Sequence, residues 1–100
     1  RSYTITGTGE VTGDKSFSVA QNYPNPFSGK SNIRINLLKN SDLSFEVYDL
    51  AGNLVFEKDY IALPKGMHDL EFNADGISQG IYFYTVISGD ERITKKMIVN

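Results

Sequence analysis

Two prolines separated by one residue interrupt the chain within residues 21–27 (QNYPNPF). Each proline fixes its own φ angle, lacks an N–H group and biases the residue before it towards extended geometry. The segment therefore cannot belong to an ordinary helix or to a central strand. Tyr23 and Phe27 flank the prolines, and we expect both rings to anchor this stiff segment on a folded domain. On local chemistry alone it is a loop that leads into that domain.

After this segment the chain consists of short extended runs separated by turn residues. Apolar residues alternate strictly over 33–37 and again over 43–48, which is the pattern of half-buried strands. Similar runs occupy residues 17–20, 54–60, 66–72, 80–87 and 91–99. About seven strands at this spacing predict an all-β antiparallel sandwich. The expected core includes Ile35, Leu37, Phe45, Val47, Leu70, Phe72 and Phe83.

Two details of the sandwich follow from local sequence. Gly52 and Asn53 both tolerate positive φ, so residues 51–53 predict a type I′ hairpin turn. Residues 80–87 are apolar with hardly any polar face, and we therefore expect this strand to be central in its sheet.

Composition limits the number of domains and the kinds of partner. One hundred residues with 40% hydrophobic content suffice for one domain with a single core. We assign residues 1–15, rich in glycine and threonine, to a linker or the tail of a preceding domain, and residues 16–100 to the domain itself. Because Arg1 opens the chain, we expect a fragment of a longer protein.

Charge and hydropathy exclude two classes of partner. A net charge of −2 gives no electrostatic reason to expect nucleic acid or an anionic membrane. No apolar run approaches the roughly 18 residues of a membrane-spanning helix, and no signal peptide opens the chain. We therefore expect no nucleic-acid partner and no membrane span.

Residues that could carry catalysis or bind a metal are scarce. The absence of cysteine excludes disulfides, thiol catalysis and Cys-based zinc sites. His68 is the single histidine, alternates in phase with Leu70 and Phe72, and is expected to be a partly buried residue of the core or its rim. The carboxylates fall in turns. Residues 73–76 resemble a fragment of a calcium loop but lack its first ligand and the bidentate Glu downstream, so we expect a turn there. We expect no catalytic residue, no metal and no cofactor, and a protein that is not an enzyme.

The last predicted strand carries the one basic cluster, formed by Arg92, Lys95 and Lys96. Lysines on an edge strand commonly protect it from pairing with another chain. The alternative is that a receptor with an acidic groove recognises this strand, either by side-chain charge or by strand addition at the sheet edge. Alternation places Lys96 and Met97 on opposite faces, and we expect Lys96 and Ile98 to be exposed.

The order of these motifs carries more information than any one of them. Residues 22–27 (NYPNPF) come first, then the alternation at 33–37, then residues 47–55 (VYDLAGNLV). Residues 80–84 (GIYFY) and 96–99 (KMIV) complete the pattern. Over residues 17–100 the chain strongly resembles the type A C-terminal sorting domain of the type IX (Por) secretion system of Bacteroidetes.

The resemblance implies an immunoglobulin-like sandwich that serves as an export address for an N-terminal cargo domain. It implies transit through the periplasm, with a shuttle protein and the outer-membrane translocon as partners, and delivery to the cell surface or the medium. A surface sortase would remove the domain by a cut before Ser16. The residues that match the family motifs are Asn22, Tyr23, Pro24, Asn25, Pro26, Phe27, Gly52, Gly80, Tyr82, Lys96, Met97, Ile98 and Val99. Asn100 departs slightly from the family, many of whose members end on a basic or apolar residue.

A second function fits the same fold. An immunoglobulin-like accessory module could bind carbohydrate or space the domains of a secreted protein. The position of the domain in the parent gene separates the two, because a sorting domain must come last.

Overall fold

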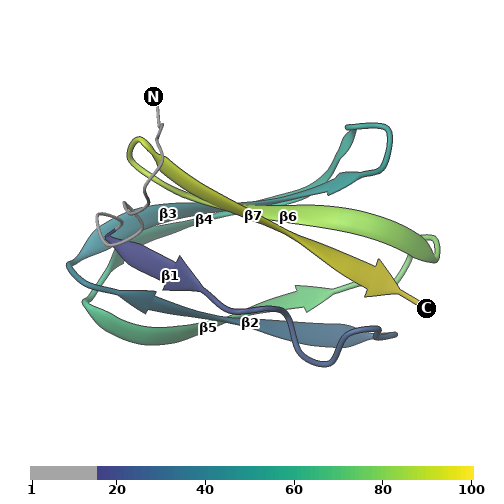
Figure 1. Ribbon diagram of the computed structural model, residues 1–100, viewed down its shortest axis with the longest axis horizontal. Coiled ribbons are helices and arrows are strands. Elements are labelled where there is room, and N and C mark those ends of the chain that lie inside the picture. The colour runs from purple at the N-terminus through teal and green to yellow at the C-terminus, as the bar shows by residue number, and fades with distance from the viewer. Residues whose placement is uncertain (1–15) are drawn as a thin grey trace, which may run out of the picture.

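The computed structural model describes residues 16–100, which form two antiparallel sheets packed face to face (Figure 1). The strands are β1 (Phe17–Val19), β2 (Lys30–Leu37), β3 (Ser41–Asp49), β4 (Leu54–Leu63), β5 (Gly66–Asn73), β6 (Gly80–Ser88) and β7 (Glu91–Val99). The three-stranded sheet has the order β1-β2-β5 and the four-stranded sheet the order β4-β3-β6-β7. The predicted seven-stranded, immunoglobulin-like all-β sandwich is confirmed. The proposed linker, residues 1–15, lies outside the described residues.

Alternation of apolar side chains builds the core between the sheets. Every second residue of β2 from Ser31 to Leu37 is buried, and β3 buries Leu43, Phe45 and Val47 in the same way. Six of the seven predicted core residues are buried, namely Ile35, Leu37, Phe45, Val47, Leu70 and Phe72. His68 is half-buried on β5, with Nε2 2.7 Å from the Pro64 carbonyl oxygen, as a residue at the rim of the core would be.

The prediction that the seventh residue, Phe83, lies in the core is wrong. It lies on β6, which is central as predicted, between β3 and β7. Tyr82, Tyr84 and Val86 face the core, so Phe83 points to the opposite face and is half-buried there. Because apolar residues occupy both faces of β6, the pattern gives no phase, and a shift of one residue reverses every side chain.

The predicted hairpin is present between β3 and β4, but the prediction of its turn type is wrong. The Asp49 N–H donates to the Asn53 carbonyl at 2.9 Å, and the Gly52 N–H donates to the Asp49 carbonyl at 3.0 Å. Gly52 has a φ of +90°, whereas Asn53 is not at positive φ. This is the geometry of a three-residue loop with a left-handed residue at its end, not of a type I′ turn. The hydrogen bond from the Asn53 backbone amide, with those from the Asn53 side chain and the Ala51 amide, lowers the pKa of Asp49.

The outer strand β4 contains a bulge next to the start of β3. Ser41 pairs with Leu63 and Leu43 with Tyr60, so two residues of β4 lie opposite Asp42. One of them, Ala62, has a φ of +56°, and its N–H donates to Asp42 Oδ1 at 2.7 Å. Ala62 is therefore a non-glycine residue held in the left-handed region by this bulge.

Candidate recognition site at the proline segment and the last strand

The proline segment, residues 21–27, connects the two sheets at one side of the sandwich. At its start, Tyr23 forms an antiparallel bridge with Asn32 of β2, with both backbone hydrogen bonds at 2.9 Å. At its end, Phe27 forms a parallel bridge with Val99 of β7. The segment thus leaves the three-stranded sheet and reaches the free edge of the four-stranded sheet. Both X–Pro bonds of the segment, before Pro24 and before Pro26, are cis.

Only one of the two predicted aromatic anchors is buried. Phe27 is 2% exposed and lies edge-to-face against Phe72, with ring centroids 6.2 Å apart. Tyr23, by contrast, is 79% exposed, so the prediction that it anchors the segment is wrong. Neighbouring residues of an extended chain point to opposite sides, and here Asn22 takes the inward side instead.

Asn22 is the second anchor, and it is held by hydrogen bonds rather than by apolar contact. It is 2% exposed, and its backbone N–H donates to the Tyr84 hydroxyl at 2.9 Å. Its side-chain amide donates to the Pro24 carbonyl at 3.1 Å and to Ser31 Oγ at 2.9 Å. The Ser31 hydroxyl donates to the same Pro24 carbonyl at 2.8 Å. A buried polar group needs such partners, and Asn22 has them.

The Tyr84 hydroxyl ties this network to the central strand β6. It donates to the Ala20 carbonyl at 2.9 Å while it accepts from the Asn22 amide. Burial raises the pKa of Tyr84 to about 12, and the hydrogen bond from Asn22 opposes part of this rise. Tyr84 therefore stays protonated, and its hydroxyl group fixes the start of the proline segment. Sequence reasoning missed both Tyr84 and Ser31, because nothing in a strand pattern marks a hydroxyl partner.

The proline segment occupies the outward hydrogen-bonding groups at the end of β7. The Phe27 N–H donates to the Ile98 carbonyl at 3.1 Å, and the Asn100 N–H donates to the Phe27 carbonyl at 2.8 Å. The Ile98 N–H donates to Asn25 Oδ1 at 2.9 Å, and Gln21 Nε2 donates to the Lys96 carbonyl at 2.6 Å. Strand addition along this part of β7 would have to displace these bonds.

The structure brings most of the predicted motif residues into one cluster. Val99 pairs with Gly80 on one side and with Phe27 on the other, and Met97 pairs with Tyr82. Met97 and Val99 are buried, Lys96 is exposed and Ile98 is half-buried, which is the expected phase. Pro24 and Pro26 are exposed, and Asn25 is half-buried. Gly52 stays outside the cluster, in the hairpin loop between β3 and β4.

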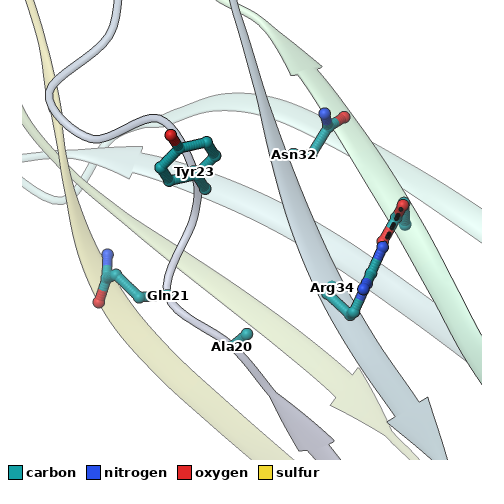
Figure 2. A pocket seen from close by; sticks show the side chains of 6 residues that line it. Ala20, Gln21, Tyr23, Asn32 and Arg34 are labelled. Carbon is teal, nitrogen blue, oxygen red and sulfur yellow. Dashed lines mark hydrogen bonds and ion pairs between the residues drawn. The ribbon is translucent and has the colours of Figure 1, made fainter.

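A shallow hollow of about 340 Å³ lies beside the proline segment (Figure 2). Tyr23 and Gln21 lie on one side of it, and Asn32 and Arg34 of β2 on the other. The Arg34 guanidinium bonds both oxygens of Asp69, at 2.8 and 3.1 Å, and this hydrogen-bonded pairing lowers the pKa of Asp69. Arg34 and Asp69, the charged residues that line the hollow, are thus paired with each other.

No group of three or more His, Cys, Asp or Glu side chains within residues 16–100 could hold a metal ion. Nor does this part contain a helix that is long and apolar enough to cross a membrane.

The fold and the cluster define an immunoglobulin-like sandwich module whose last strand is fastened by its own proline segment. The family model described as the secretion system C-terminal sorting domain, that of type IX secretion, matches residues 21–100, and the chain belongs to this family. Comparison with curated proteins gives no match.

A solved structure supports the fold. The crystal structure of dimeric latent PorU from Porphyromonas gingivalis aligns with a TM-score of 0.66 and 22% sequence identity. The alignment covers 89% of this chain and 10% of that one, so the chain spans a small part of the neighbour's length. At this identity the likeness concerns the fold alone.

Proposed function

We propose that this domain is the export address of an N-terminal cargo protein, read by the type IX machinery of a Bacteroidetes bacterium. The domain would carry its cargo from the periplasm, with a shuttle protein, through the outer-membrane translocon to the cell surface or the medium. There a sortase would cut before Ser16 and release the domain. In this role the domain needs no catalytic residue, cofactor or metal.

The observation that carries the proposal is the family match over residues 21–100. This range contains every residue of the predicted sorting motifs. The geometry adds a physical reason. The opening motif and the terminal motif are hydrogen-bonded to each other through Phe27, Asn25 and Ile98. An address that must survive transit benefits from such a pre-organised form, because a receptor then spends no binding energy on ordering it.

A fusion experiment tests the proposal. Residues 1–100 are joined to the C-terminus of a periplasmic reporter and expressed in a type IX host and in a translocon-deficient strain of the same host. We expect the reporter at the surface or in the medium of the first strain and in the periplasm of the second. Retention in the periplasm of both strains would refute the export function.

The same fusion separates the accessory-module function from the sorting function. A spacing or carbohydrate-binding module would leave the reporter where its own signal places it. The hollow beside Tyr23 and Asn32 is the place where a sugar could stack and hydrogen-bond. Sugar binding that is lost in Tyr23→Ala, together with a failure of export, would favour that alternative.

A further inference from the structure

The outer face of the four-stranded sheet carries an apolar patch, which we call the outer patch. It consists of Tyr48, Leu54, Ile81, Phe83 and Ile98, which share the face opposite the core. Tyr48 pairs with Leu54 on β4 and with Phe83 on β6, and Ile81 pairs with Ile98 on β7. Leu54 and Ile81 are 46% and 39% exposed. The uncovered face of an antiparallel sheet is ordinarily polar, so this composition indicates a surface that a partner covers.

Charges of opposite sign flank the outer patch on its two sides. Lys96 of β7 pairs with Phe83 and is exposed at one margin. Towards the other margin, Glu46 of β3 lies directly opposite Glu57 of β4, a like-charge pair, and Glu46 Oε1 accepts a hydrogen bond from the Tyr48 hydroxyl at 2.7 Å. The one ion pair within residues 16–100 is that of Arg34 with Asp69, on the other sheet, so none of these three charges is neutralised by an ion pair there.

The outer patch lies far from the point where the chain enters the domain. The Ser16 N–H and hydroxyl both donate to Glu91 Oε1, at 2.8 and 2.9 Å, which places Ser16 at the start of β7. Ile98 and Lys96 lie near the end of the same strand, roughly 17–23 Å away at the rise of an extended chain. The chain therefore enters the described domain at the opposite end of β7 from the outer patch.

We propose that the outer patch is the surface by which a receptor protein of the export machinery holds this domain. The receptor would present an apolar strip, with a carboxylate opposite Lys96 and a basic group opposite Glu46 and Glu57. Charge complementarity of this kind fixes the orientation of the complex, while the apolar strip supplies most of the affinity. The inference rests on the proposed function, because an export address is read by another protein. It differs from strand addition, since it uses side chains and leaves the β7 edge bonded to the proline segment.

The test uses the reporter fusion with substitutions inside and outside the outer patch. Phe83→Thr and Ile98→Thr remove apolar contact area and keep β propensity. Ile61→Thr on β4 and Met67→Thr on the three-stranded sheet are matched controls, because these residues are 71% and 59% exposed and lie outside the patch. We expect export of each patch variant to be about tenfold slower than that of the parent fusion, and the controls to match the parent.

Stability and self-association are measured on the purified chain, residues 1–100. The patch variants are expected to keep the denaturant midpoint of the parent, and Ile81→Thr, at an exposed margin, replaces Phe83→Thr should the latter unfold. Export of both patch variants at the parent rate overturns the receptor surface while the sorting function stands. Failure of the parent fusion itself refutes the sorting function. A parent chain that dimerises, with a monomeric Phe83→Thr variant, assigns the patch to a second copy and also overturns the proposal.

Discussion

Phe27 and Val99 lie side by side in a parallel bridge, although they come from opposite ends of the domain. Phe27 donates its N–H to β7 and accepts the N–H of Asn100, so both of its backbone groups are used. Its ring is at the same time buried against Phe72. One residue therefore closes the edge of the four-stranded sheet and contributes to the core between the sheets.

Phe27→Ala is expected to lower the free energy of unfolding by about 3 kcal/mol, because it leaves a cavity beside Phe72. Chemical denaturation followed by fluorescence or circular dichroism measures this loss. Tyr23→Ala is the control from the same segment, and at 79% exposure it should change stability by less than about 0.5 kcal/mol. Equal effects of the two substitutions would contradict the one-sided anchoring seen here.

Asn25→Ala is expected to cost about 1 kcal/mol of stability, because the Ile98 N–H loses its acceptor. Asn25→Asp keeps an oxygen at that position and should restore most of the loss. Amide hydrogen exchange at Ile98 gives a local readout, with faster exchange in the alanine variant. Unchanged protection at Ile98 would show that this hydrogen bond does not hold the strand.

The sequence predicted the strands and most of the core because alternation is visible wherever one face of a strand is polar. It misplaced Phe83, since β6 is apolar on both faces and has no phase of its own. It also assigned the second anchor to Tyr23 rather than Asn22, because the hydrophobic ring of Tyr23 suggested burial. The partners that hold Asn22, Tyr84 and Ser31, lie elsewhere in the sequence and are brought to it only by the fold. Contact between the opening and terminal motifs likewise depends on tertiary structure, which spacing alone does not contain.

Tyr84→Phe should destabilise the domain at neutral pH by about 2 kcal/mol, since the Asn22 N–H and the Ala20 carbonyl lose their partner. The pKa of Tyr84 is raised from 10.0 to about 12 in the folded state. Because the pKa of Tyr84 is higher in the folded state than in the unfolded state, the protonated hydroxyl stabilises the fold at pH values below the unfolded-state pKa. The contribution is therefore complete below pH 10 and is lost as the pH rises towards 12. Denaturation midpoints across this range should fall more steeply for the parent chain than for Tyr84→Phe, and parallel curves would contradict the assignment.

Ala62→Gly is expected to stabilise the domain by about 0.5–1 kcal/mol, because glycine adopts a left-handed φ without the strain that a Cβ brings. The greater freedom of glycine in the unfolded chain offsets part of the gain. Gly52→Ala is the reciprocal change, and at a φ of +90° it should destabilise. No steric contact complicates it, since an added Cβ would meet no atom within 4 Å. A loss of stability in Ala62→Gly would show that the bulge is not strained.

Lys96→Glu should leave the fold unchanged and slow export of the reporter fusion. Lys96 is exposed at the margin of the outer patch, and charge changes at exposed positions usually alter stability by less than about 0.5 kcal/mol. The substitution would set a negative charge against the carboxylate expected on the receptor, which lowers the rate of capture. Lys30→Glu, a charge reversal at an exposed position on β2 of the other sheet, is the control and should be exported at the parent rate. A folded Lys96→Glu fusion that accumulates uncleaved in the periplasm supports a receptor contact. If it is exported and processed like the control, Lys96 only protects an edge strand from pairing with another chain.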